Sequence, residues 1–119
     1  MRHIFHLANC GTCQRILKDW QPSADITLQN IKTEPITEAQ IDEMQRLSGS
    51  YEALFSRIAM KYRKMGLHEQ TLVEADYRRL ILEEYTFLKR PVLILEEQIF
   101  IGNSPKNVQA ALEALEKSH

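Results

Sequence analysis

The two cysteines of the chain, Cys10 and Cys13, stand two residues apart in the segment NCGTCQR, and this spacing constrains the fold most. The residues before them, 2–8, are mostly apolar, as in a short buried strand. After them, apolar side chains recur at i, i+3, i+4 and i+7 as far as Trp20, which predicts an amphipathic helix. We therefore expect a strand, a turn with glycine and a helix in that order, with Cys10 at the start of the helix.

This position predicts a reactive thiol at Cys10. The first turn of a helix presents backbone N–H groups without helical partners and the positive end of the helix dipole. A thiolate is stabilised there, so the pKa of Cys10 should be lowered and its reactivity at neutral pH raised. Cys13, one turn later, lies close enough to attack a sulfur adduct on Cys10 and close a disulfide.

Three other interpretations of the cysteine pair stay open. The two thiols could be inert core residues, or they could form a static disulfide, which adds little stability across so short a loop. They could also bind zinc together with His3 and His6, although structural zinc sites usually draw ligand pairs from separate knuckles. We expect no bound metal and no bound cofactor.

Composition favours one domain spanning residues 1–119. The net charge of −1 argues against general binding to nucleic acid or to a membrane surface. No apolar run is long enough to cross a membrane, and the N-terminus leads into a strand without a signal-peptide pattern. We expect a cytoplasmic protein, in which a C-x-x-C pair is more often redox-active or metal-binding than structural.

The middle of the chain predicts a second strand and then only helices. Residues 26–31 alternate apolar and polar, as in a strand that runs parallel to the first. A capping box of Thr37 and Gln40 begins the helical stretch, and a second capping-box pattern begins at Thr71. Between them, Phe55 and Ile58 mark the expected inward face of a helical segment that starts near residue 50. Two shorter helices in place of one remain an alternative for this segment.

The C-terminal part predicts a hairpin and a final helix. Residues 91–95 and 98–101 flank a short polar turn, and Ser104 followed by Pro105 suits a helix start. The sum is an α/β fold with a thioredoxin-like mixed four-stranded sheet, βαβ…ββα. Its core would be residues 1–33 and 86–119, with 34–85 as an inserted all-helical subdomain. Arg90–Pro91 stands at the start of the third strand, where the thioredoxin architecture has its proline, so we also predict that this peptide bond is cis and close to Cys10. A trans proline that only begins the strand is the alternative.

Four segments, in order along nearly the whole chain, resemble the ArsC/Spx/YffB family, the glutaredoxin-dependent arsenate reductases and their relatives. Ile4-Phe5-His6 with Cys10-Gly11-Thr12 is similar to the opening of the family, and residues 54–63, LFSRIAMKYR, are similar to its middle segment. Residues 88–92, LKRPV, resemble its arginine–proline signature, and residues 102–105, GNSP, resemble its loop before the last helix.

The resemblance implies roles for several side chains. The nucleophile would be Cys10, with a thiol tuned by His6 on the preceding strand. A small oxyanion such as arsenate would be bound by Arg63 and Arg90, because planar guanidinium groups bind such anions bidentately. The remaining binding residues of these motifs would be Thr12 and Pro91.

Two departures from the family pattern bear on function. Arsenate reductases of this family carry an arginine in the loop before the last helix, where this chain has Asn103, an uncharged residue. They also typically have one active cysteine in the first motif, whereas Cys13 supplies this chain with a second thiol. In this respect the chain is similar to the Spx branch, whose C-x-x-C acts as a redox switch.

We therefore expect a thiol-dependent, arsenate reductase-like oxidoreductase. In this interpretation Cys13, or glutathione as a co-substrate, resolves the adduct on Cys10, and glutaredoxin or thioredoxin restores the thiols. Two alternatives stay open. One is a redox-sensing, Spx-like transcription regulator that binds RNA polymerase, and the other is a glutathione-linked thiol protein of unknown substrate.

Overall fold

A computed structural model describes residues 1–118, which divide into two compact units. The first, called here the sheet unit, consists of Met1–Glu34 and the chain from Arg90 onward. The second, called the helical unit, is Pro35–Lys89. No helix among the described residues is long and apolar enough to cross a membrane.

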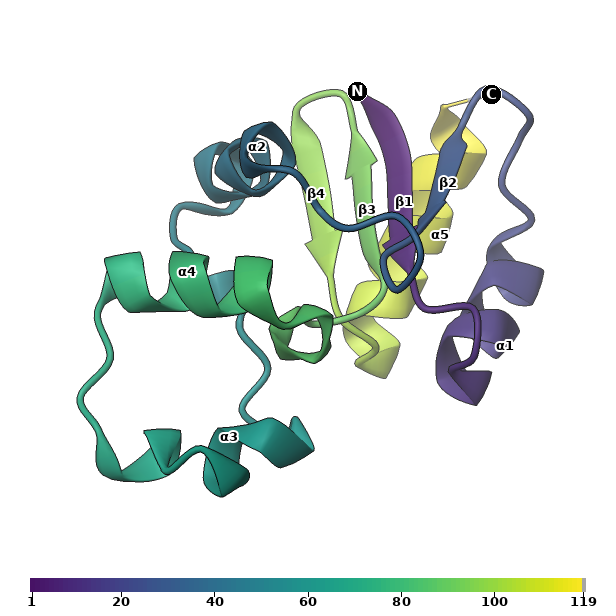
Figure 1. The fold of residues 1–119 in the computed structure, drawn as a ribbon. Helices are drawn as coiled ribbons and strands as arrows, with labels where there is room; N and C mark the ends of the chain where they lie inside the picture. Colours follow the sequence, from purple (N-terminus) through teal and green to yellow (C-terminus); the bar gives the residue numbers. More distant parts are fainter. Residues whose placement is uncertain (119) are drawn as a thin grey trace. The chain divides into compact units, whose positions relative to one another are not determined.

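The sheet unit contains four strands and two helices (Figure 1). In chain order they are β1 (Arg2–His6), α1 (Gly11–Trp20), β2 (Thr27–Asn30), β3 (Val92–Leu95), β4 (Gln98–Ile101) and α5 (Pro105–Lys117). The strand order is β2-β1-β3-β4. Strands β1 and β2 are parallel, whereas β3 is antiparallel to both β1 and β4. The predicted mixed four-stranded α/β sheet with βαβ and ββα parts is therefore confirmed.

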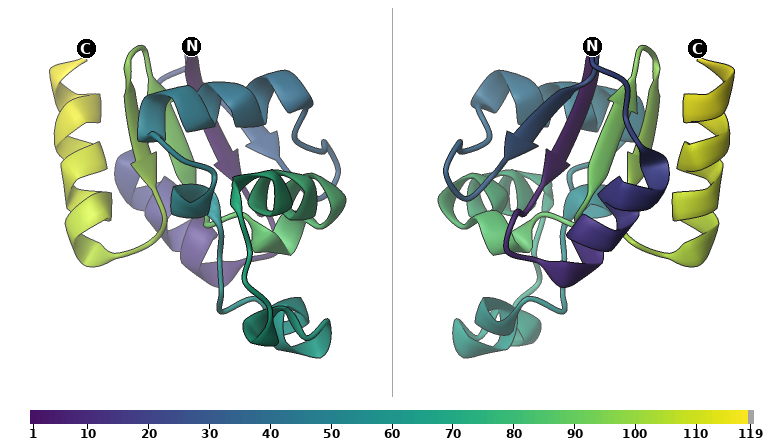
Figure 2. Two further views of the ribbon diagram at one scale, coloured as in Figure 1. Left: turned by 90° about the vertical axis from the view of Figure 1, so that its left-hand side faces the viewer. Right: turned by 90° about the vertical axis from the view of Figure 1, so that its right-hand side faces the viewer.

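Helices α1 and α5 pack on one face of this sheet (Figure 2). Apolar side chains of the strands and of both helices form one buried cluster between them, consisting of Ile4, Ile16, Trp20, Ile26, Leu93, Leu95, Ala111 and Leu115. The indole N–H of Trp20 donates to the backbone carbonyl of Val108, 3.1 Å away, and so connects the two helices directly. This packing fixes the start of α1 at one end of β1.

The helical unit contains three α-helices and three short 3₁₀ turns among the described residues. They are α2 (Glu38–Ser48), η1 (Glu52–Leu54), α3 (Met60–Lys64), η2 (Leu67–Glu69), α4 (Glu74–Glu83) and η3 (Tyr85–Phe87). Aromatic rings form part of its interior. The ring centroid of Phe55 lies 5.0 Å from that of Phe87 and 5.0 Å from that of Tyr77.

The segment after α2 is broken, as the sequence allowed, but it differs from the prediction because part of it is extended rather than helical. The chain becomes extended at Phe55, which forms an isolated antiparallel bridge with Leu88. Two backbone hydrogen bonds flank the bridge, from Ser56 N–H to the carbonyl of Phe87 at 2.7 Å and from Lys89 N–H to the carbonyl of Leu54 at 2.8 Å. These bonds connect residues 87 and 89 to the segment around Phe55 within the helical unit.

The prediction that Ile58 faces inward is wrong, since its side chain is 91% exposed. Ile58 lies between the extended bridge and the short helix α3, so the helical spacing that relates it to Phe55 does not exist in the structure.

The predicted capping box at the start of α2 is confirmed. Thr37 Oγ1 accepts the N–H of Gln40 at 3.1 Å, and Gln40 Oε1 accepts the N–H of Thr37 at 3.1 Å.

The expected capping box at Thr71 is wrong. Helix α4 starts at Glu74 with Val73 as its N-cap residue, and the N–H of Val73 donates to the Asp76 carboxylate at 2.9 Å. Asp76 thus satisfies a backbone donor at the start of the helix and places a negative charge in its first turn, where the helix dipole favours it.

These two helix starts predict unequal effects of similar substitutions. Thr37→Ala should lower the free energy of unfolding by about 1 kcal/mol, because the N-cap hydrogen bond is lost. Thr71→Ala should change it by less than about 0.5 kcal/mol, as for an ordinary exposed site. Guanidinium denaturation of the two variants and the parent chain measures both values. Equal destabilisation by the two substitutions would contradict the observed start of α4.

Candidate functional site

The backbone between β1 and α1 presents Cys10 at the start of the helix, as predicted. Cys10 is the N-cap residue of α1, with extended backbone angles of φ −100° and ψ 116°. Its own N–H donates to the carbonyl of Leu7 at 3.1 Å, and the Gln14 side-chain amide donates to the carbonyl of Ala8 at 2.7 Å. These two bonds hold the turn that follows β1, so the position of the thiol is set by the backbone.

The Cys10 thiol has a lowered pKa, chiefly because it accepts the backbone N–H of Cys13. The Cys13 side chain, the backbone N–H of Thr12 and the positive charge of Arg90 lower it further, in that order, whereas partial burial opposes them. These donors belong to the first turn of α1, where N–H groups have no helical acceptor. The prediction of an activated thiol at Cys10 thus agrees with its surroundings.

Cys13 has the opposite character. Its side chain is 1% exposed, and this burial raises the pKa of its thiol. The negative charge of Cys10 raises it further, whereas a hydrogen bond from the backbone of Leu7 and the charge of Arg90 lower it. Both cysteines are free thiols in this structure. The pair therefore divides into Cys10, which ionises more readily than an ordinary thiol, and Cys13, which ionises less readily.

This division has a consequence for the order of reaction. When an uncharged group bonds to Cys10 Sγ, the negative charge is removed from that sulfur and no longer raises the pKa of Cys13. The backbone of Leu7 and the guanidinium of Arg90 still favour the Cys13 thiolate. Formation of such an uncharged adduct would therefore favour ionisation of Cys13. The contribution of the Leu7 backbone was missed from the sequence, where no side chain signals it.

Arg90, which lies two residues before the first residue of β3, acts on both thiols through its positive charge. The peptide bond between Arg90 and Pro91 is cis, as predicted. The carbonyl of Pro91 accepts the N–H of Gly102 at 2.9 Å, and the carbonyl of Gly102 accepts the side-chain amide of Asn107 at 2.8 Å. The loop containing Asn103, whose side chain is exposed, is thereby tied to the same chain segment as Arg90.

His6 is buried at the end of β1, with its side chain 9% exposed. Burial lowers its pKa, so the imidazole is neutral at neutral pH and brings no charge to the cysteine pair. Its Nδ1 atom is buried without a hydrogen-bond partner. The structure thus provides a neutral imidazole on the strand that leads to Cys10, and its tuning role remains a prediction.

Arg63 belongs to the helical unit, where it lies exposed on α3. It is therefore not part of the site that the sheet unit builds, and its role in binding an anion remains a prediction. Across residues 1–118, no group of three or more His, Cys, Asp or Glu side chains could hold a metal ion.

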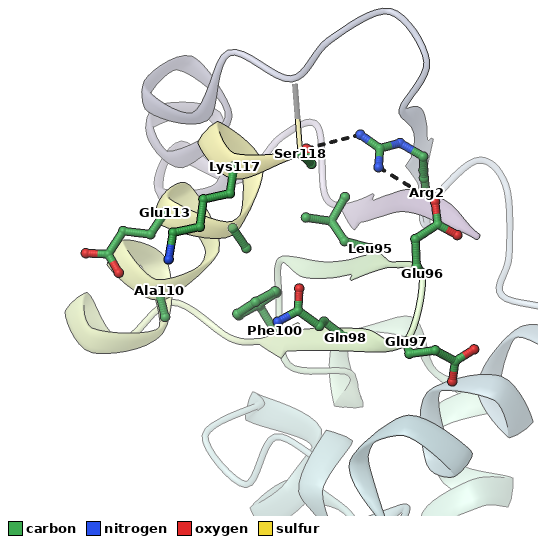
Figure 3. A pocket seen from close by; sticks show the side chains of 11 residues that line it. Arg2, Leu95, Glu96, Glu97, Gln98, Phe100, Ala110, Glu113, Lys117 and Ser118 are labelled. Carbon is green, nitrogen blue, oxygen red and sulfur yellow. Dashed lines mark hydrogen bonds and ion pairs between the residues drawn. The ribbon is translucent and has the colours of Figure 1, made fainter.

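A groove of about 490 Å³ lies elsewhere on the sheet unit, between the β3–β4 turn and the end of α5 (Figure 3). Leu95 and Phe100 supply apolar surface, and charged side chains such as Glu113 and Lys117 border it. Arg2 donates to Ser118 Oγ at 3.2 Å beside it. None of the predicted site residues lines this groove, so it is separate from the cysteine pair.

Residues 5–111 match the ArsC family, and the chain belongs to that family. The global transcriptional regulator Spx 2 of Bacillus anthracis is similar to it, with 23% identity over 113 residues that cover 92% of this chain and 85% of the regulator. A solved structure of a protein named YffB has a TM-score of 0.74 at 21% identity, covering 94% of this chain and 99% of its own. An arsenate reductase from Vibrio cholerae has a TM-score of 0.74 at 14% identity, covering 92% and 95%.

These similarities confirm the ArsC/Spx/YffB assignment and the thioredoxin-like fold with its helical insertion. At such identities the solved structures establish the fold alone. The family places the chain among thiol oxidoreductases and their relatives, and the choice among activities depends on the site itself.

The two thiols should differ in their dependence on pH. Cys10 should be alkylated by iodoacetamide at a pH where an ordinary thiol, with a pKa of about 8.5, is still protonated. Cys13 should react only at higher pH. Mass spectrometry of the two peptides, from mildly acidic to alkaline pH, measures both midpoints.

Two variants separate the causes of the lowered pKa. Cys13→Ala removes a hydrogen-bond donor but keeps the backbone N–H, and Arg90→Gln removes the positive charge. Both should raise the pKa of Cys10, and Cys13→Ala should raise it more, because the side-chain hydrogen bond outweighs the charge of Arg90. A larger shift with Arg90→Gln would show that the guanidinium, rather than the S–H donor, controls the thiol.

Proposed function

We propose that this protein is a thiol-dependent oxidoreductase that uses Cys10 as nucleophile and Cys13 as resolving thiol. The observation that carries the proposal is the pairing of an activated, partly exposed Cys10 with a buried, protonated Cys13 one turn later on α1. Such a pair reacts in a fixed order, because Cys10 ionises more readily than Cys13 and is the more exposed of the two thiols. We assign this chemistry to the cytoplasm, where a C-x-x-C pair is kept reduced.

Arsenate is the first substrate to test. The Cys10 thiolate attacks arsenic and water leaves, giving a thiolate adduct of arsenic(V). The Cys13 thiolate then attacks Cys10 Sγ, the sulfur–arsenic bond breaks with its electron pair on arsenic, and arsenite leaves. Two thiols have then been oxidised to one disulfide while arsenic has gained two electrons.

The other participants follow from the same scheme. Glutathione would take the resolving role where Cys13 does not, and glutaredoxin or thioredoxin would return the cysteines to thiols by disulfide exchange. Arg90, and Arg63 of the helical unit, would bind the oxyanion through bidentate hydrogen bonds. Thr12 would contribute its backbone N–H, and Pro91 the backbone that carries Arg90 into the site.

Arsenate-dependent oxidation of NADPH tests the proposal, with glutathione, glutathione reductase and glutaredoxin, and then with thioredoxin and its reductase. Cys10→Ser should abolish activity. Cys13→Ser should abolish it with thioredoxin and retain it with glutathione only if glutathione resolves the adduct. Arg90→Gln and Arg63→Gln should each lower kcat/KM by about ten- to hundredfold, because hydrogen bonds to charged groups contribute about 1.5–3 kcal/mol.

Arg79→Gln provides the matched control. Arg79 lies on α4 and pairs with Asp76 and Glu83 at 3.5 Å, so the substitution removes the same charge away from the predicted motifs. It should leave kcat/KM unchanged. Loss of activity equal to that of Arg90→Gln would show that the arginine effects are general, and no activity with either donor system would remove arsenate as the substrate.

The similarity to Spx 2 supports a second candidate function, a regulator whose cysteine pair controls binding to RNA polymerase. Under this candidate, oxidation to the Cys10–Cys13 disulfide should change the amount of purified RNA polymerase captured by the immobilised chain. For the Cys10→Ser and Cys13→Ser variants, the amount of RNA polymerase captured should change with neither oxidant nor reductant. Equal capture by the oxidised and reduced chains, or no capture, would exclude redox control of this interaction.

A further inference from the structure

We propose that the groove between the β3–β4 turn and α5 binds an extended segment of a partner protein, which adds to the sheet as a fifth strand beside β4. The segment has apolar side chains at alternate positions and carries lysine or arginine. None of the cysteine-site residues lines the groove, so this inference is independent of the proposed thiol chemistry. A free strand edge, a stripe of α5 and the charge of the rim support it.

Strand β4 is an edge strand of the sheet. In the order β2-β1-β3-β4 of the described sheet, β4 pairs with β3 alone. The hydrogen bond from Gly102 N–H to the carbonyl of Pro91, at 2.9 Å, makes this opposed pair a bonded one. Because bonded and non-bonded pairs alternate in an antiparallel ladder, Ile99 and Ile101 then occupy the non-bonded positions opposite β3.

The N–H and C=O groups of Ile99 and Ile101 therefore point away from β3. Within residues 1–118, no group hydrogen-bonds to them. Proteins usually block such an edge with a charged side chain or a proline, because it pairs readily with another strand. Strand β4, with the sequence QIFI, contains neither. It thus presents donors and acceptors in the pattern that strand addition uses.

One stripe of α5 lies beside this edge. In Figure 2 the helix lies beyond β4, on the side away from β3. The residues of α5 that line the groove recur at i, i+3, i+4 and i+7, and they are Ala110, Glu113, Ala114 and Lys117. Two of the four are alanines, whose short side chains leave room above the helix. A strand added to β4 at the usual spacing of about 4.8 Å would occupy this space.

The alternation of side chains in β4 predicts which side chains of the added strand enter the groove. Gln98 and Phe100 line it, so the side chains of Ile99 and Ile101 belong to the opposite face of the strand. Paired strands place opposed residues on the same face, so every second side chain of the segment would lie next to Phe100. Phe100 and Leu95 supply apolar surface there. Apolar residues are therefore expected at alternate positions of the segment.

The rim of the groove favours a cationic segment. Its carboxylates outnumber its cations, with Glu96, Glu97 and Glu113 against Arg2 and Lys117. Arg2 lies 3.7 Å from Glu96, so these two charges offset each other. Glu97 belongs to the β3–β4 turn and Glu113 to α5, which places a carboxylate on each wall. A lysine or arginine of the segment would be attracted to these walls, and an acidic segment would be repelled.

Nuclear magnetic resonance of the isotope-labelled full chain tests the proposal with peptides of defined sequence. The probe is Ac-KTVTVTVTK-NH2, and the reference, Ac-KTTVVVTTK-NH2, has the same composition without alternation. We expect the probe to bind with a dissociation constant below about 1 mM. Binding should shift the amide signals of Ile99 and Ile101 and, at saturation, slow their hydrogen exchange about tenfold, because these N–H groups become hydrogen-bonded.

The reference peptide should bind at least about threefold more weakly, because fewer of its apolar side chains reach the groove face at once. Replacing both lysines of the probe with glutamate should weaken binding by about two- to fivefold or more, as for exposed charge pairs. Both comparisons use the same amide signals of the unmodified protein, so they do not depend on the folding of any variant.

Protein variants locate the segment. Ile99→Pro removes an outward donor but no bond to β3, and should weaken binding about fivefold. Ala110→Phe fills the groove and should abolish binding, whereas Ala39→Phe, the same change at an exposed alanine of α2 outside the lining, should leave it unchanged. Glu113→Gln should weaken binding about two- to fivefold, and Glu116→Gln, its control on the same helix, should not. If Ile99→Pro does not fold, the α5 variants still decide the matter.

Several results would overturn the proposal. They are unchanged signals of Ile99 and Ile101 with the probe at about 1 mM, equal binding of the reference peptide, or equal effects of Ala110→Phe and Ala39→Phe. Protection of the two amides without peptide, rising with protein concentration, would assign the edge to a second copy of this chain. Protection at every protein concentration would show that the chain itself covers the edge.

Discussion

The backbone N–H groups at the start of α1, directed at the Cys10 sulfur, are the interaction on which the rest of the site depends. They exist because β1 ends in a short turn and the helix begins immediately at Gly11. The position of that helix is in turn fixed by the apolar cluster beneath it and by the bond from Trp20 to the carbonyl of Val108. A cysteine at the same sequence spacing without this packing would be an ordinary thiol.

The chemical difference between the two cysteines follows from a small difference in position. Cys10 precedes the first helical residue and is partly exposed, whereas Cys13 lies one turn later on the buried face of α1. Each affects the other, because the thiolate of Cys10 opposes ionisation of Cys13 while the thiol of Cys13 stabilises that thiolate. The same short segment thus holds two thiols of different acidity, and the charge on Cys10 influences the ionisation of Cys13.

Features determined by neighbouring residues could be predicted from the sequence. They include the position of Cys10, the capping box of Thr37 and Gln40, and the hairpin of β3 and β4. These depend on turn, cap and period rules that act over a few residues. Together with the four family-like segments they were sufficient to predict the thioredoxin-like sheet.

Features determined by distant contacts could not. The extended segment at Phe55 is held by Leu88, far along the chain, so helical spacing around residue 58 was misleading. Helix α4 begins after Val73 because the Asp76 carboxylate accepts the N–H of Val73. The capping pattern at Thr71 therefore predicted the wrong N-cap residue. The influence of Leu7 on Cys13 acts through the backbone, whose donors are the same for every residue type.

The division of the chain at residues 34 and 90 has an evolutionary consequence. The thiol chemistry resides in the sheet unit, which is assembled from the two ends of the chain, while the helical unit is a continuous insertion with its own interior. Mutations in the insertion can accumulate without changing the ionisation of the cysteines, since every group that shifts the Cys10 pKa belongs to the other unit. Lineages with the same redox centre are thus free to acquire different recognition surfaces, which accords with a family whose members are named both as reductases and as a transcription regulator.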